Sequence, residues 1–128
     1  FSLLSLCLNA TPLGRGTHAK GKVTVNLEKQ LGGTVTFEQF NETSFASYGQ
    51  FEKGFTENNP SNYFILLEGF QIEDFVRAGI VIHAPSTEPF FCGFFGYVSK
   101  IIGKKYAILH NDGEKIKTIA SGIVKRSS

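Results

Sequence analysis

The segment GKVTVNLEKQLGGTVTFEQF, residues 21–40, constrains the fold more than any other part of the chain. Its apolar residues alternate with polar ones over residues 23–27 and again over residues 35–37. A period of two is the pattern of a strand with one buried face, and the Gly32-Gly33 pair between the two runs favours a tight reversal of the chain. The segment therefore predicts a β-hairpin.

The rest of the sequence continues this succession of apolar runs and turns. Aromatic and β-branched residues recur in short runs, and 14 glycines stand against four prolines, which is the balance of an all-β protein with glycine turns. We expect roughly eight strands in one domain. Residues 71–77 fit either a short strand or one helical turn, and Asn111-Asp112-Gly113 predicts a tight turn within a C-terminal hairpin.

The charge of the chain limits its partners. A formal net charge of +2, with basic residues scattered along the sequence, does not provide the clustered positive surface that nucleic-acid binding needs. The apolar runs are also shorter than a membrane-spanning helix. We expect neither a nucleic-acid partner nor a transmembrane span.

The opening residues, FSLLSLCLNA, are apolar over the length of the central region of a signal peptide. We interpret residues 1–19 as a signal-peptide remnant or flexible lead-in, which predicts a secreted or extracellular protein. The same composition fits a first buried strand over residues 1–8. The two interpretations differ in their consequence for the cysteines, because Cys7 and Cys92 could form one disulfide only if residue 7 is retained.

The motif Asn41-Glu42-Thr43 has the Asn-x-Thr pattern of an N-glycosylation site. It lies in a polar stretch between two predicted strands, which is the exposed setting such a site needs. We therefore expect a glycoprotein that is modified at Asn41.

Five pieces of sequence carry a resemblance to a known family. They occur in a fixed order between Lys20 and Val98, and they read KVTVNLEKQLGGTVTFEQ, GQFEKGFTE, NYFILLEG, IVIHA and CGFFGYV. In this order they resemble the copper/zinc superoxide dismutase family. The resemblance implies a Greek-key β-barrel or sandwich over residues 20–98 with a truncated zinc loop, followed by an extra C-terminal β-hairpin and tail over residues 99–128.

The resemblance also locates the metal site of the family on this sequence. Its two copper-ligating histidines of one strand fall at Ile65 and Leu67, which cannot bind copper. A later copper ligand falls at His83, the one ligand that is retained, and the arginine that guides superoxide falls at Pro89. The loop that holds the zinc ligands is missing after Phe70.

These losses leave one imidazole of the set that superoxide chemistry requires. We expect a non-catalytic superoxide dismutase-like domain, a pseudoenzyme without a cofactor, that acts as a secreted binding or structural module. The alternative is a copper-dependent superoxide dismutase, or a relic that binds metal weakly through His83. From its place in a strand, we expect His83 to be structural, hydrogen-bonded in the core or at its edge, and we expect His110 to lie in solvent beside a turn.

The run PFFCGFFGYV is apolar on both faces if its residues alternate. We expect the outer aromatics, with Phe90 and Phe94 as candidates, to be covered by the C-terminal hairpin. The alternative is an exposed patch through which the domain forms a homodimer or binds a protein partner.

Overall fold

The computed structural model describes residues 5–7 and 22–126 of the 128-residue chain. Its elements are β1 (Ser5–Cys7), β2 (Val23–Leu27), α1 (Glu28–Leu31), β3 (Gly33–Gln39), β4 (Ser44–Gly49), the 3-10 turn η1 (Pro60–Asn62), β5 (Tyr63–Leu67), β6 (Glu73–Asp74), α2 (Phe75–Ala78), β7 (Ile82–His83), β8 (Ser86–Thr87), β9 (Phe90–Phe95), the 3-10 turn η2 (Val98–Ile101), β10 (Lys105–Asn111), β11 (Ile116–Ile123) and β12 (Lys125–Arg126).

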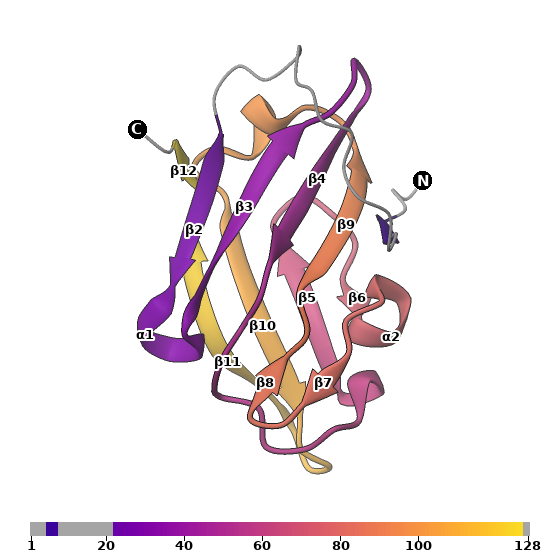
Figure 1. Ribbon diagram of the computed structural model, residues 1–128, viewed down its shortest axis with the longest axis vertical. Coiled ribbons are helices and arrows are strands. Elements are labelled where there is room, and N and C mark those ends of the chain that lie inside the picture. Colours follow the sequence, from indigo (N-terminus) through magenta and orange to yellow (C-terminus); the bar gives the residue numbers. More distant parts are fainter. Residues whose placement is uncertain (1–4, 8–21, 127–128) are drawn as a thin grey trace.

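These strands form two large antiparallel sheets. The first has the order β1-β9-β4-β3-β2-β12 and the second the order β11-β10-β5-β6, while β7 and β8 form a separate hairpin. Figure 1 shows β2, β3, β4 and β9 in one layer and β5, β10 and β11 in the layer behind it. The predicted all-β fold is confirmed, and in the described part of the chain it is an open pair of sheets rather than a closed barrel.

The first hairpin is confirmed as β2 and β3, which pair from Val23 opposite Phe37 to Leu27 opposite Gly33. The turn between them is wider than a glycine pair alone would make it, because residues 28–31 form the single helical turn α1. Gly32 ends this turn with a φ of 71°, a left-handed conformation that glycine adopts without steric cost. The arrangement turns the side chain of Leu31 back into the core.

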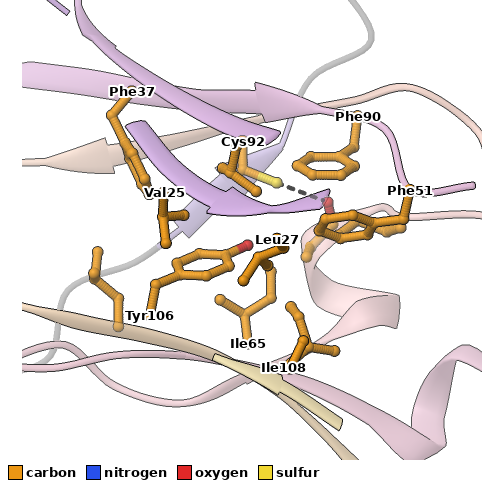
Figure 2. Close-up of a cluster of buried hydrophobic side chains, with 14 of the residues drawn as sticks. Val25, Leu27, Phe37, Phe51, Ile65, Phe90, Cys92, Tyr106 and Ile108 are labelled. Carbon is orange, nitrogen blue, oxygen red and sulfur yellow. Dashed lines mark hydrogen bonds between the residues drawn. The ribbon is translucent and has the colours of Figure 1, made fainter. Parts of the chain in front are cut away.

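Side chains from both sheets fill the space between them (Figure 2). The ring of Phe37 on β3 meets the ring of Tyr106 on β10 edge to face, with centroids 5.8 Å apart. Leu27, Ile65 and Ile108 lie in the same buried cluster. Full burial of one such side chain stabilises a fold by about 1.5 to 3 kcal/mol, so this contact between the layers supplies a large part of the stability of the domain.

The predicted C-terminal hairpin is present as β10 and β11, which are joined across the turn at 112–115. On its other side β10 pairs with β5, from Tyr106 opposite Leu67 to His110 opposite Tyr63. The hairpin is therefore built into the second sheet, and it contributes Ile108 and Ala120 to the same core as the rest of the chain.

The chain passes from the second sheet to the first at Val124. This buried residue separates β11 from β12, and β12 pairs with β2 through Lys125 opposite Thr24. Gly122 permits the close approach of the two sheets here, because a Cβ atom at this position would lie 2.8 Å from Cγ2 of Val25. One side of the sandwich is thus held together by a continuous stretch of backbone.

The segment after Phe70, for which strand and helical turn were both possible, contains one of each. Glu73 and Asp74 form the short edge strand β6, and α2 follows directly. Asp74 begins the helix because its Oδ1 accepts a hydrogen bond from the backbone N–H of Arg77 at 2.8 Å. The same arginine lies 3.8 Å from the carboxylate of Glu73.

The Phe-rich strand β9 sends alternate side chains into the core. Phe94 stacks on Phe45 with ring centroids 5.2 Å apart, and Phe90 lies 5.4 Å from Phe51. Cys92, between them on the same face, is fully buried. The inner face of β9 is therefore part of the main core.

The outer face of β9 carries the other aromatics. Phe91 stacks on Tyr48 of the neighbouring strand at 6.4 Å, and Phe95 is 49% exposed. This corrects two details of the sequence interpretation. Phe90 and Phe94 lie on the inward face of β9, where Phe94 also meets Phe70 of the segment after β5 at 5.8 Å, so they are not outer aromatics that the C-terminal hairpin covers. As core residues they do not form a surface for a partner.

Strand β1 lies at the edge of the first sheet and pairs with β9, in a register that places Cys7 opposite Cys92. Cys92 is disulfide-bonded, and its sulfur lies 3.3 Å from the carbonyl oxygen of Ala78. Because they pair with β9, residues 5–7 form a strand. This agrees with the interpretation of the opening residues as a first strand. The remainder of the predicted signal remnant, residues 1–4 and 8–19, lies outside the described residues, and its cleavage stays a prediction.

The register identifies Cys7 as the expected disulfide partner of Cys92, since the sequence contains two cysteines. We expect Cys7→Ser to lower the free energy of unfolding by about 2 to 4 kcal/mol, because the bond restricts the unfolded chain. Urea denaturation measures the loss, and reduction of the wild-type protein should reproduce it. Two titratable thiols in the unreduced, denatured protein would contradict the pairing, and a secreted protein whose sequence begins after residue 7 would show that Cys7 is removed.

Tyr106 carries a hydroxyl group that the core leaves without a hydrogen-bond partner in the described part of the chain. Its burial also raises the pKa of the phenol. We expect Tyr106→Phe to leave the free energy of unfolding unchanged or to raise it by about 1 kcal/mol, because the variant removes a buried polar group that pays a desolvation cost.

The matched control is Tyr63→Phe, since the Tyr63 hydroxyl accepts a hydrogen bond from the backbone N–H of Thr56 at 3.0 Å. This variant should lose about 1 kcal/mol. Chemical denaturation of both variants provides the comparison, and a Tyr106→Phe variant that loses as much stability as the control would show that its hydroxyl is satisfied in solution.

Candidate functional site

Ile65 and Leu67 occupy the positions at which the resemblance places two copper-ligating histidines. Both lie on β5 with side chains that are 5% and 1% exposed, and their neighbours on β10 are Ile108 and Tyr106. Figure 2 shows Ile65 and Ile108 within the apolar cluster between the sheets. The place that the resemblance assigns to a metal is therefore occupied by hydrocarbon side chains, which offer no donor atom.

His83, at which the resemblance places a third copper ligand, lies on the small β7–β8 hairpin. Its Nε2 atom is 2.7 Å from Oε2 of Glu88, and both side chains are more than half exposed. The expectation that His83 is hydrogen-bonded in the core or at its edge is thus corrected: it is hydrogen-bonded, but at the surface. The inward residue of this strand is its neighbour Ile82.

Glu68, which directly follows β5, has a structural role, and Pro89, at which the resemblance places the guiding arginine, lies at the surface. Oε1 of Glu68 accepts a hydrogen bond from the backbone N–H of Lys105 at 2.9 Å, which joins the end of β5 to the start of β10. Pro89 is exposed immediately before β9. Among residues 5–7 and 22–126, no three His, Cys, Asp or Glu side chains are grouped so that they could hold a metal ion.

A polar cluster that sequence analysis missed lies at the opposite end of β5. His110 is buried and stacks on Tyr63, with ring centroids 4.3 Å apart and planes 7° from parallel. Its Nε2 atom lies 2.8 Å from Oε2 of Glu57. The side-chain amide of Asn62 donates to the same carboxylate at 3.1 and 3.2 Å. The expectation that His110 lies in solvent is therefore wrong.

The alternation of β10 could have revealed the burial of His110. Residues 106, 108 and 110 share one face of the strand, and the first two, Tyr106 and Ile108, are core residues. The tight turn begins only after Asn111, so the pattern of the strand extends to His110. Its partner Glu57 lies in an irregular segment without periodicity, and no signal in the sequence places it there.

The electrostatics of this cluster follow from its hydrogen bonds. The contact with His110, and then those with Asn62, hold the pKa of the Glu57 carboxyl below its ordinary value of 4.5. An imidazole beside a carboxylate is a pair that can transfer protons. Here, however, the imidazole is buried against Tyr63, so the pair lies in the wall of the core and not at the mouth of a cleft.

A surface depression lies elsewhere, over the junction of β2 and β11. It is lined by Thr24, Asn26, Gly122, Ile123 and Lys125. Lys125 is the one charged residue in this lining, and the depression is separate from both histidine contacts. It does not have the convergent acid, base and nucleophile of a catalytic site.

The predicted glycosylation site lies at the surface. Asn41, Glu42 and Thr43 are exposed in the turn between β3 and β4. Oδ1 of Asn41 accepts hydrogen bonds from the backbone N–H of Thr43 at 2.8 Å and from its hydroxyl at 3.2 Å. The acceptor asparagine is therefore part of an ordered turn and is open to solvent.

Comparison with known proteins finds no protein-family profile, no curated protein and no solved structure that matches this chain. Among the described helices, none has the length and apolar character needed to cross a membrane.

The Glu57–His110 contact should make stability depend on pH. Because the pKa of Glu57 is lowered in the folded protein, its stabilising effect is complete above the ordinary glutamate pKa and is lost as the pH falls through the folded value. We expect Glu57→Gln to be less stable than the wild-type protein at about pH 5, and this difference to shrink toward about pH 3. Thermal unfolding at several pH values measures the difference.

Glu52→Gln is the matched control, because it removes the same charge from an exposed side chain. A stability difference between wild type and Glu57→Gln that stays constant over this range of pH, or that Glu52→Gln reproduces, would contradict the role of the Glu57–His110 contact.

Proposed function

We propose that this chain is a non-catalytic superoxide dismutase-like domain that works as a secreted binding or structural module. The proposal is supported by where the five resembling pieces lie. They coincide with the β2–β3 hairpin, the end of β4 and the segment after it, β5, the β7 region and the end of β9. Superoxide dismutases of this family are among the proteins that share a two-sheet sandwich architecture.

The connections between the strands also support a Greek-key arrangement. The chain passes from β4 in the first sheet to β5 in the second, returns from β6 to β9 beside β4, and then passes again to β10 beside β5. Connections that leave a sheet and return beside an earlier strand are characteristic of Greek-key sandwiches. This agreement goes beyond composition, because it concerns the order in which the strands pair.

The proposal that the domain is non-catalytic depends on one observation, the burial of Ile65 and Leu67. A copper ion at their positions would need imidazole donors and room between the sheets. Instead, the two side chains pack against β10 and are almost fully buried. The same packing that holds the layers together removes the chemistry that the resemblance would otherwise imply.

The surface pair of His83 and Glu88 favours the alternative function, a weak metal-binding relic or a copper-dependent dismutase. Its imidazole nitrogen and carboxylate oxygen lie 2.7 Å apart and are open to solvent. Two donors of this kind can hold Cu²⁺ loosely, whereas redox catalysis requires a site with several imidazoles. We therefore rank this function second.

A homodimer or protein partner stays part of the proposal, with a different contact residue. Phe90 and Phe94 are in the core, so in the unmodified chain the Phe-rich strand can offer only its outward residues to a partner. Phe95 is the exposed one of these. We propose that it takes the place of Phe90 and Phe94 in any such contact.

Metal analysis after purification with added copper tests the proposed function. We expect far less than one copper per chain and no dismutation of superoxide, because the two central donor positions are aliphatic. The variant His83→Ala should not change either result. Stoichiometric copper with an activity that His83→Ala abolishes would establish the copper enzyme in place of the binding module.

A further inference from the structure

Three exposed aromatic residues lie at one end of the first sheet. Phe40, Phe95 and Tyr97 are 40%, 49% and 51% exposed. Phe40 follows the last residue of β3, Phe95 ends β9, and Tyr97 comes two residues later. We call these three residues the aromatic end. A contiguous exposed apolar patch marks a place that something covers, whereas singly exposed apolar residues are ordinary, so these rings indicate such a place only if the three residues lie together.

The side chain of Gln39 shows that the backbone segments of the aromatic end lie together. Its amide nitrogen is 3.0 Å from the carbonyl oxygens of Ser44 and Gly96, and its Oε1 accepts a hydrogen bond from the backbone N–H of Val98 at 2.7 Å. The backbone N–H of Gly96 also donates to the carbonyl oxygen of Thr43 at 2.8 Å. The turn that contains Phe40 is thus fixed against the segment that contains Phe95 and Tyr97.

The acceptor motif Asn41-Glu42-Thr43 occupies this same turn. Asn41 directly follows Phe40, and Thr43 is hydrogen-bonded to Gly96 between the other two aromatics. The end of the molecule with the exposed rings is therefore also the end with the glycosylation motif. By contrast, Asn59-Pro60-Ser61 has proline at the middle position, which excludes it as an acceptor.

The hydrogen bonds of the turn are compatible with a modified asparagine. The two bonds that the Asn41 side chain makes among the described residues both go to Oδ1. An N-linked sugar is attached at Nδ2 and leaves the amide carbonyl unchanged. Modification would therefore preserve both contacts with Thr43.

From these observations we propose that Asn41 carries an N-linked glycan whose first sugars lie over the aromatic end. In the reaction, Nδ2 of Asn41 forms a bond to C1 of the sugar of a lipid-linked oligosaccharyl diphosphate. The bond between C1 and the diphosphate oxygen breaks, Nδ2 loses one proton, and the lipid diphosphate leaves, with no change of oxidation state. The apolar C–H faces of the sugar then pack on the aromatic rings, which present extended apolar surface.

This inference rests on the secretion that is part of the proposed function, but its test is independent of the metal. The full chain is expressed behind a secretion signal in a glycosylating eukaryotic host, and the peptide containing residue 41 is examined by mass spectrometry. We expect this peptide to carry a hexose-containing glycan that peptide N-glycosidase removes, which converts Asn41 to aspartate. Copper binding with activity would overturn the proposed function and leave this result unaffected.

Two variants and one control test whether Asn41 is the residue that carries the glycan. Asn41→Gln and Thr43→Ala each remove one essential residue of the motif and should abolish the mass shift, while Glu42→Gln keeps the motif and should retain it. A secreted, folded protein in which Asn41 is unmodified would overturn the proposal. Because the Asn41→Gln turn could fold poorly, enzymatic removal of the glycan from the folded wild-type protein provides a second comparison.

The position of the glycan is tested by sedimentation and by binding of a fluorescent hydrophobic dye. We expect the glycosylated protein to be monomeric, and we expect its dye fluorescence to increase when the glycan is removed. Phe40→Ser should reduce that increase, because it removes one of the rings that the sugar covers. Dye binding that does not change on deglycosylation, or a glycosylated dimer that Phe95→Ser dissociates, would show that the sugars do not cover the aromatic end.

Discussion

The packing of β5 and β10 against β2 and β3 is the contact on which the rest of the structure depends. The contact between Phe37 and Tyr106 joins the two layers, and the inward row of β5 extends it along the second sheet. Because protein interiors are packed as densely as organic crystals, this row leaves no room for a cluster of metal ligands. The packing of the core and the absence of donor atoms at the positions that the resemblance assigns to copper are therefore two results of the same side chains.

The parts of the fold that sequence analysis predicted are those with a regular pattern. The alternation over residues 23–27 and 35–37 and the turn at 111–113 both correspond to observed hairpins. The pattern could not show where the outer and inner faces of β9 lie, because both are aromatic, and it is burial that separates Phe94 from Phe95. The switch between sheets at Val124 was also hidden, since it depends on the space around Gly122 rather than on any local preference.

The candidate sites differ in the same way: residues in a regular strand pattern were predicted, and residues whose placement depends on a distant part of the chain were not. The apolar nature of Ile65 and Leu67 was evident from the sequence, and their burial agrees with the alternation of β5. His110 was misplaced because its partner Glu57 is 53 residues away in the sequence, and such a contact forms only when β10 docks beside β5. His83 was misplaced for a different reason: the side chains of Ile80 and Ile82 face the core, so the alternation of this segment turns the side chain of His83 toward solvent.

The Gln39 side chain has a consequence for the order in which the protein folds. Its partners on the β3–β4 turn are local, but Gly96 is 57 residues away along the chain, so the complete set of contacts can form only after β9 has paired with β4. A contact with such a large loop to close belongs late on the folding pathway. Changes at Gln39 should therefore act mainly on the rate at which the folded protein opens, and only slightly on the rate at which it forms. The end of the sheet that carries the exposed aromatics would then close after the β3–β4 hairpin has formed and open before that hairpin does.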